Sequence, residues 1–287
     1  MNYRHSFHAG NFADVMKHIV LTRIIEYLKL KDKAFRVIDT HAGSGIYALT
    51  EGDAARTGEW HGGIEKLLNA RLEGKAADLL LPYVLAVQAQ NGSGELKSYP
   101  GSPKITRSLL RKQDRLTAIE LHPQDARRLA KLFEGDYQTR VIELDGWLSL
   151  GAHLPPKEKR GLVLIDPPFE ESGEFDRLIE GLQKAYGRWP GGIYALWYPV
   201  KDRTAVVKFH DALAQSGISK ILRAELMVRG LSNEARLDGS GMIIVNPPFV
   251  LEAELRQLLP MLTRQIGEDA GAGFRLDWIA GELRSAP

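Results

Sequence analysis

Cysteine is absent from the 287 residues of this chain. Without cysteine the chain forms no disulfide bond, holds no zinc ion or iron–sulfur cluster through thiolates, and has no thiol nucleophile. This excludes disulfide-stabilised scaffolds, cysteine-ligated zinc modules, radical enzymes with a cysteine-held cluster, and enzymes that attack a pyrimidine through cysteine. Any chemistry that the chain performs must use other side chains.

Long apolar runs and a strong excess of one charge are also missing. No apolar stretch is long enough to span a bilayer, and the polar, aromatic start of the chain is unlike a signal peptide, so we expect a cytoplasmic protein. The net charge is only +2, so any contact with nucleic acid must come from a local basic patch. A hydrophobic content of 44% in a chain of this length allows one large domain or a domain with an insert.

Short apolar stretches of strand length alternate with segments of helical spacing along most of the chain. This alternation predicts an α/β fold with a mostly parallel, doubly wound sheet. Residues 229–240 are too few for a helical crossover, so the last two strands should form an antiparallel hairpin. The expected strands are 35–39, 117–120, 139–144, 161–165, 192–197, 219–228 and 241–246, and the expected helices are 12–30, 125–133, 174–186 and 203–215.

The stretch from Gly45 to Thr117 contains no clear strand and has helical spacing instead. The expected helices are 57–70, 76–90 and 103–112, and Pro82 is a candidate break in the second. We therefore predict three parts: residues 1–50 with the N-terminal helix and the first strand–helix unit, an inserted helical subdomain at 51–113, and the rest of the core at 114–287.

The most informative motif is Asp166-Pro167-Pro168-Phe169, which follows the apolar run 161–165. It resembles the active-site signature of enzymes that methylate exocyclic amino groups of bases. The carboxylate and a carbonyl of the proline segment could each accept one N–H of such a group, which frees its lone pair and stabilises the developing positive charge. The Phe169 ring offers a stacking face. The structural alternative is a proline turn with an aromatic plug.

A second copy, Asn246-Pro247-Pro248-Phe249, fits the same general pattern because an amide oxygen can also accept a hydrogen bond. Chain order favours the first copy, since several strand–helix units follow Asp166, whereas too little chain remains after Asn246 to finish a sheet. We interpret the second copy as the exit of the last strand, with structural prolines.

Polar residues also stand at the ends of the first three core strands. The first strand runs into the glycine-rich turn Asp39-x-His41-x-Gly43-x-Gly45, where backbone can approach a ligand beside a helix N-terminus. A tight turn without a ligand explains these glycines equally well. Glu120 and Asp145 end the next two strands. Because ligands of such sheets bind at the carboxyl ends of strands, these acids and Asp166 predict one site, with S-adenosylmethionine as the cofactor.

Most of the chain resembles the bacterial methyltransferases that modify N6 of an adenine in 23S ribosomal RNA, the RlmJ type. The most specific match is the N-terminal string Tyr3-Arg4-His5-Ser6-Phe7-His8-Ala9-Gly10-Asn11-x-Ala13-Asp14-Val15-x-Lys17-His18. The other matching motifs are Asp39-Thr40-His41-Ala42-Gly43-x-Gly45, Tyr99-Pro100-Gly101-Ser102-Pro103, Glu120-Leu121-His122-Pro123, Asp145-Gly146 and Asp166-Pro167-Pro168-Phe169.

This resemblance implies a monomeric, S-adenosylmethionine-dependent enzyme with a Rossmann-like methyltransferase fold and a small inserted helical subdomain. By motif position it places His18, His41, Ser102, Glu120, Asp145, Gly146 and Asp166 at the cofactor, and Tyr3, His5 and Lys17 at the RNA. Asp166 would also orient the target N6. One departure is Phe169, where the relatives carry tyrosine; Phe keeps the stacking face and lacks the hydroxyl.

Several alternatives stay open. The spacing of His5, His8, His18 and His41 fits no strong metal template, so we expect polar contacts and no metal site. The other histidines, His61, His122, His153 and His210, are expected at the surface. Two basic groups could either hold phosphates or form a solvated face. They are Arg107, Arg111, Lys112 and Arg115, and Lys157, Lys159 and Arg160.

The rival functions are a DNA adenine-N6 methyltransferase, which would use the same motif, and a non-catalytic RNA-binding protein with a methyltransferase fold. The lack of a separate target-recognition domain disfavours the first rival, and the intact acid at position 166 disfavours the second.

Overall fold

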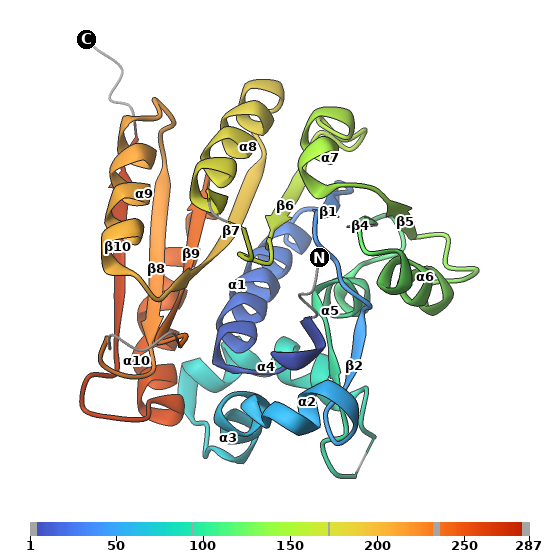
Figure 1. The fold of residues 1–287 in the computed structure, drawn as a ribbon. Coiled ribbons are helices and arrows are strands. Elements are labelled where there is room, and N and C mark those ends of the chain that lie inside the picture. The colour runs from blue at the N-terminus through green and yellow to red at the C-terminus, as the bar shows by residue number, and fades with distance from the viewer. Residues whose placement is uncertain (1–4, 93, 172, 232–235, 283–287) are drawn as a thin grey trace.

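The computed structural model describes residues 5–92, 94–171, 173–231 and 236–282. Its centre is an eight-stranded sheet in the order β10-β8-β9-β7-β6-β1-β4-β5 (Figure 1). Five neighbouring strands, from β7 to β5, run parallel. These strands are β1 (Arg36–Asp39), β4 (Arg115–Glu120), β5 (Thr139–Glu143), β6 (Gly161–Ile165) and β7 (Ile193–Val200).

The other half of the sheet is antiparallel. Strand β9 (Gly239–Val245) pairs antiparallel with both β7 and β8 (Ile221–Met227), so the expected hairpin is confirmed. The chain then continues through α10 (Leu251–Ile266) into β10 (Gly273–Ala280), which pairs antiparallel with β8. The expectation that too little chain remains after Asn246 to finish a sheet is therefore wrong, and the motif at Asn246 does not follow the last strand.

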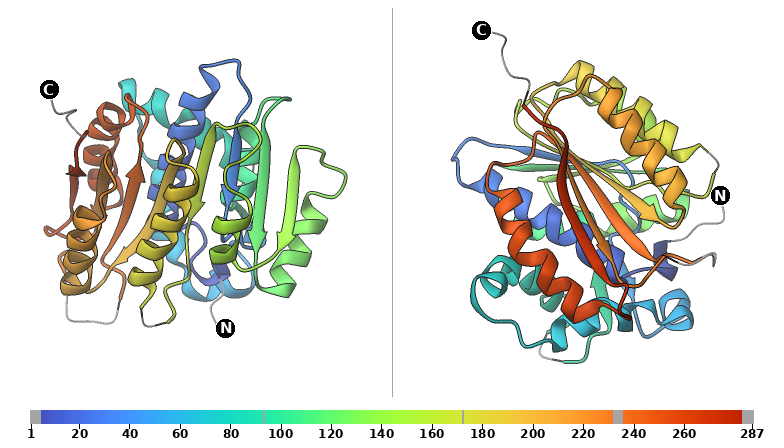
Figure 2. Two further views of the ribbon diagram at one scale, coloured as in Figure 1. Left: turned by 90° about the horizontal axis from the view of Figure 1, so that it is seen from above. Right: turned by 90° about the vertical axis from the view of Figure 1, so that its left-hand side faces the viewer.

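Helices cover both faces of the sheet (Figure 2). On one face α1 (Phe12–Lys29) and α10 pack on the strands; on the other lie α7 (Gly146–Ala152), α8 (Glu174–Arg188) and α9 (Arg203–Gln215). Helix α6 (Pro123–Leu132) packs beside β4 and β5. No helix within the described ranges is long and apolar enough to cross a membrane.

Helix α1 begins where its sequence predicts. Asn11 caps it, because its side-chain oxygen accepts hydrogen bonds from the backbone N–H groups of Ala13 and Asp14 at 2.9 and 3.0 Å. The helix is buried along most of its length, with apolar residues packed against the sheet. A short 3-10 turn, η1 (His5–Phe7), precedes it and lies beside α2 (Gly52–Thr57).

The segment between β1 and β4 is mostly helical, as expected, but it also contains two short strands that pair with each other. Pro82 lies within one continuous helix and does not divide it. Side chains of this segment share one core cluster with α1 and the sheet, and the division of the chain near residues 50 and 113 stays a prediction. The elements are β2 (Ile46–Ala48), α2, η2 (Glu59–Gly62), α3 (Ile64–Asn69), α4 (Gly74–Gln88), β3 (Ser98–Pro100) and α5 (Ser102–Leu109).

Candidate active site

Two cavities meet at the carboxyl ends of the parallel strands. Four residues line both of them: His5, Lys17, Asp166 and Pro168. The first cavity extends over the ends of β1, β4 and β5, and the second extends over β7 toward the loop after β8. Asp166, immediately after β6, therefore stands where a molecule in one cavity would face a molecule in the other.

The Asp166 carboxylate is held by a buried lysine. Lys17 of α1 forms ion pairs with Asp166 and, at 2.8 Å, with Asp14. Burial works against the charge of Lys17, but the two carboxylates outweigh it and raise its pKa. Burial also works against the charge of Asp14, and its positive neighbours nevertheless hold its pKa well below the usual range. Lys17 thus stays a cation between two carboxylates and fixes where the Asp166 oxygens point.

The acids at the neighbouring strand ends line the first cavity. Glu120 accepts hydrogen bonds from the backbone N–H groups of Gly43 and His122, each at 2.7 Å. Asp145 caps α7 by accepting from the Trp147 N–H at 2.8 Å. Each carboxylate oxygen can accept more than one hydrogen bond, so both side chains keep acceptor capacity toward the cavity.

Glycine is required at two points of this wall. Gly43 has φ +61°, and a Cβ there would lie 2.0 Å from the Tyr47 hydroxyl oxygen. At Gly146 a Cβ would lie 2.3 Å from the Thr40 carbonyl oxygen and would also collide with the His41 ring. Any side chain at these positions would move the strand-end residues that form the cavity.

The glycine-rich turn does not lead into a helix, contrary to expectation. It leads into β2, and the helix that faces the turn is α5, which follows 56 residues of intervening chain. Gly101 donates its N–H to the Gly45 carbonyl at 2.9 Å and so brings Ser102, the first residue of α5, to the cavity wall. The local sequence predicted the turn but not its partner, because the chain returns to it only after the inserted segment.

His18 connects the cavity to that segment. Its Nδ1 lies 2.7 Å from the hydroxyl of Tyr99 in β3, which in turn lies 2.8 Å from the hydroxyl of Tyr83 in α4. Its Nε2 is buried and lacks a hydrogen-bond partner within the described residues. Burial lowers the His18 pKa to about 3, so the ring is neutral at physiological pH. A buried nitrogen without a partner beside a cavity is suited to a ligand atom.

The second cavity has aromatic and proline walls. Phe169 packs edge-on against Trp197 of β7, with ring centroids 5.7 Å apart, and lies 5.0 Å from the ring of Phe175. Phe169 has φ +51°, so its backbone turns away from the direction of β6. Pro199 and Lys201 continue the wall, and Arg229 stands at its far side. Such walls accept a flat ring, and the basic groups suit a nearby phosphate.

The structure brings most of the predicted site residues together. His18, His41, Gly43, Ser102, Glu120, Asp145 and Gly146 line the first cavity; Phe169 lines the second; His5, Lys17, Asp166 and Pro168 line both. Gly45 and Pro167 do not line either cavity, and Tyr3 lies outside the described residues. Sequence reasoning missed Tyr47, Trp147 and Arg177 in the first cavity and Trp197 and Arg229 in the second.

The second copy of the motif lies at the opposite edge of the sheet. Val245, just before Asn246, pairs with Tyr194 near the start of β7, because β9 runs antiparallel to its neighbour. Asn246 donates two hydrogen bonds, to the carbonyls of Pro190 and Gly192 at 2.8 and 2.7 Å. Its amide therefore fastens a turn far from Asp166, and the interpretation of structural prolines agrees with this position.

The histidines divide among the surface, the site and the core: His61 is exposed as expected, whereas His122, also expected at the surface, lines the first cavity. Within the described ranges, no group of three or more His, Cys, Asp or Glu side chains could hold a metal ion. His210, expected at the surface, is buried: it bonds to the Tyr198 hydroxyl at 3.0 Å and to the Arg223 guanidinium at 2.7 Å. The surface prediction for His210 is wrong because α9 turns this side chain toward the sheet.

The strand order, with five parallel strands continued by the antiparallel β9 and with a cavity over the parallel strand ends, defines the Rossmann-like methyltransferase fold. Residues 32–280 match the family described as ribosomal RNA large subunit methyltransferase D, RlmJ. The chain belongs to this family.

Relatives support the same assignment over nearly the whole chain. The chain is 45% identical to ribosomal RNA large subunit methyltransferase J of Escherichia coli and 41% identical to the protein of that name from Haemophilus influenzae, over 98% of this chain and all of each relative. A crystal structure of a Legionella pneumophila protein superposes with a TM-score of 0.86 at 36% identity and covers 94% of this chain and 98% of that chain.

Proposed function

We propose that the protein transfers a methyl group from S-adenosylmethionine to the exocyclic N6 of one adenine in 23S ribosomal RNA, as a monomer and without a metal ion. The observation that carries this proposal is the position of Asp166 on the wall that the two cavities share. A donor in the first cavity and a base in the second would meet at that carboxylate. Membership of the family supports methyl transfer to ribosomal RNA.

The residues of the first cavity fit the donor. When bound, S-adenosylmethionine supplies an electrophilic methyl group on a sulfonium. Glu120 can accept from ribose hydroxyls, and Asp145 can accept from the adenine amino group of the donor. The unpartnered Nε2 of His18, together with the first turn of α5 at Ser102, can hold the donor carboxylate, since a helix N-terminus favours an anion.

The residues of the second cavity fit a flipped adenine. Phe169 and Trp197 provide ring faces and edges against which the base can stack. Asp166 and a carbonyl of the proline turn accept the two N6 hydrogens, which draws the nitrogen toward a tetrahedral geometry and directs its lone pair at the methyl group. The same acceptors would stabilise the positive charge that develops on N6 as the N–CH3 bond forms and the S–CH3 bond breaks. S-adenosylhomocysteine would then be the leaving group, and N6 would give up one of its two protons. Lys17 keeps the Asp166 carboxylate oriented during this step.

The decisive test replaces Asp166. Asp166→Ala and the isosteric Asp166→Asn should lower methyl transfer at least about 100-fold, because a preorganised acceptor for developing charge is lost. The substrate is ribosomal RNA from cells that lack the protein. The assay measures incorporation of labelled methyl groups into this RNA, and the modified base is then mapped. Affinity for S-adenosylhomocysteine, measured by calorimetry, should stay within a fewfold. The exposed Asp211→Asn serves as the matched control.

Three outcomes would contradict the proposal. Near-normal turnover of Asp166→Ala would remove Asp166 from the chemistry. Methyl incorporation into DNA in preference to RNA would assign the protein to DNA adenine methylation. Binding of the donor analogue without transfer to any RNA would identify a non-catalytic RNA-binding protein.

A further inference from the structure

Basic residues gather at the edge of the sheet opposite the cavities. Three loops enter the central strands β1, β4 and β6 there, at residues 29–36, 110–115 and 155–160. They contain ten of the 38 Lys and Arg residues of the chain but only three of its 36 acidic residues. We call these three loops the basic edge. The near-zero net charge of the chain therefore conceals a strong local excess of positive charge.

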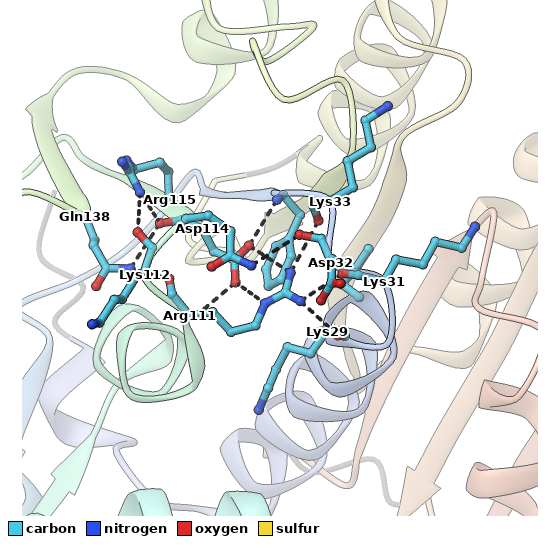
Figure 3. A network of polar contacts seen from close by, with 12 residues as sticks. Lys29, Lys31, Asp32, Lys33, Arg111, Lys112, Asp114, Arg115 and Gln138 are labelled. Atoms are coloured by element: carbon cyan, nitrogen blue, oxygen red, sulfur yellow. Dashed lines mark hydrogen bonds and ion pairs between the residues drawn. The ribbon is translucent and has the colours of Figure 1, made fainter.

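Arg111 and Arg160 hold the backbone of the basic edge in place, and Figure 3 shows the contacts of Arg111. Arg111 donates to the carbonyls of Lys29, Lys31 and Lys33 at 3.0, 2.8 and 3.3 Å, and it pairs with the buried Asp114. Arg160 donates to the same Lys33 carbonyl at 3.0 Å and to the Leu28 carbonyl at 2.6 Å. Both guanidinium groups lie over the Phe35 ring, at 5.6 and 5.9 Å.

The lysines of the basic edge project from this framework into solvent. Figure 3 shows the Lys31, Lys33 and Lys112 side chains extending away from the hydrogen-bonded network. Five lysines are exposed, and none of the five makes an ion pair with a described residue: Lys31, Lys33, Lys112, Lys157 and Lys159. Of the three acids in these loops, Asp114 is buried and paired with Arg111, and Glu158 is paired with Arg36 at 2.9 Å. In these described loops, only the exposed Asp32 is left to oppose the five lysines.

An exposed aromatic residue lies at the same edge of the sheet, since β9 ends beside the start of β7. Phe249, at the end of the second Asn-Pro-Pro-Phe copy, is 82% exposed. Its ring contacts Tyr27 in the last turns of α1 edge-on, with centroids 5.7 Å apart, and the basic edge begins where this helix ends. The Asn246 amide fixes the turn that presents Phe249. An exposed phenyl ring at the same edge of the sheet as a group of exposed lysines suits an unpaired base whose backbone phosphates contact those lysines.

We infer that the basic edge and Phe249 form a second RNA-contact surface, which binds phosphates and stacks on an unpaired base of a ribosomal RNA segment remote from the target adenine. The inference rests on the proposed function for the identity of the RNA. The central strands of four to six residues separate this surface from Asp166 by roughly 15–20 Å of sheet. The full-length folded RNA offers segments for both edges of the sheet at once, whereas a short hairpin held at the target offers few further nucleotides to the opposite edge.

The first test removes the charge. A variant with Gln at positions 31, 33, 112, 157 and 159 is compared with a matched variant with Gln at five exposed lysines elsewhere, Lys75, Lys97, Lys131, Lys184 and Lys208. Binding of protein-free 23S ribosomal RNA is measured at several salt concentrations. We expect the basic-edge variant to lose at least about tenfold in affinity for the RNA. We also expect the negative slope of log binding constant against log salt to become shallower by about 2 or more, because phosphate contacts are lost. The control variant should keep most of the affinity for RNA and most of the salt dependence of binding.

The second test separates remote contacts from catalysis. For the basic-edge variant, KM for full-length 23S RNA should rise at least about tenfold, while kcat and the KM for a short hairpin that carries the modified base should stay unchanged. Phe249→Ala should raise KM for the full-length RNA about threefold or more, and Phe274→Ala, at another exposed position, should not.

Equal losses in the two lysine variants, or equal losses on the short hairpin and the full-length RNA, would overturn the inference. Failure of the proposed function is distinguishable, because the wild-type protein would then transfer no methyl group to either RNA. The binding comparison between the two lysine variants would still decide whether the basic edge contacts RNA.

Discussion

The carboxyl group of Asp39 is the most buried acid near the two cavities. It ends β1 and is fully buried, and its only polar contacts within the described ranges, with the Ser102 side chain and the His41 backbone, are too weak to offset that burial. Burial raises its pKa to about 7 from an ordinary value of 3.8. Asp39 therefore differs from Asp166, whose charge is matched by Lys17, although both acids follow apolar strands in the sequence.

This difference predicts how stability depends on pH. Between about pH 4 and 7 folded Asp39 keeps a proton that the unfolded chain has lost, so its contribution to the free energy of unfolding falls as pH rises through this window, by up to about 4 kcal/mol. Asp39→Asn removes this titration and should flatten the decline. Urea unfolding at pH 4.5, 6 and 8 measures the free energy of unfolding of the wild type and of this variant.

The exposed Asp211→Asn should leave the pH profile of the wild type unchanged. An identical decline in the Asp39→Asn variant would show that the folded protein already holds Asp39 in its charged form. A steeper decline would contradict the sign of the shift.

At the residue scale the sequence predicted which acids gather at the strand ends but not how they differ. Glu120, Asp145 and Asp166 line the first cavity as expected. The partners that set their chemistry come from distant parts of the chain: Lys17 lies 149 residues before Asp166, and Gly43 lies 77 residues before Glu120. No local pattern contains these pairs, because the fold alone brings them together.

At the element scale, β3 and α4 of the segment between β1 and β4 support the cavity through side chains. Tyr99 of β3 stacks on the His18 ring, with centroids 5.6 Å apart, and its hydroxyl bonds both to His18 and to Tyr83 of α4. These three rings are buried, so each polar atom left unpaired there is costly. The hydroxyl pair therefore fixes the orientation and tautomer of His18.

Tyr99→Phe should weaken donor binding without disturbing the reacting groups. The change leaves His18 Nδ1 without its partner, so the ring loses its fixed orientation toward the first cavity. We expect the Kd for S-adenosylhomocysteine to rise by roughly 3- to 30-fold, consistent with the loss of a buried hydrogen bond. At saturating donor, kcat should change less than twofold.

Tyr186→Phe on α8 is the matched control, since it changes the same group away from the cavities. If Tyr99→Phe and the control bind the donor analogue equally well, the hydroxyl chain has no part in the site. A large drop in kcat alone would place Tyr99 in catalysis instead.

The elements that the sequence missed had different signals. Strand β10 has an alternating pattern, Phe274, Leu276 and Trp278, which is typical of a strand, so its absence from the prediction was avoidable. Strands β2 and β3 contain three residues each and exist because they pair with each other across about 50 residues. No period can be read from three residues, so these strands could not be predicted.

At the scale of the whole molecule, the two edges of the sheet have opposite characters. The carboxyl edge carries the acids and both cavities, and the opposite edge carries the basic loops and Phe249. The sequence predicted the parallel sheet and the hairpin of β8 and β9, and it separated the two Pro-Pro-Phe motifs by role but did not predict that they lie at opposite edges of the sheet. Their separation follows from the direction of β9, which runs against β6 and β7.

If the first cavity binds the donor, then the donor product should stabilise the entire fold. A ligand at 100 times its Kd adds about 2.7 kcal/mol to the free energy of unfolding, so S-adenosylhomocysteine should raise the melting temperature by about 5 °C at that excess. Glu120→Gln should reduce this shift, because an amide cannot accept from Gly43 and His122 together. Phe249→Ala, at the opposite edge of the sheet, should show the full rise in melting temperature. Differential scanning fluorimetry over a range of ligand concentrations measures all three, and a wild-type protein that does not respond would show that the cavity is not the donor site.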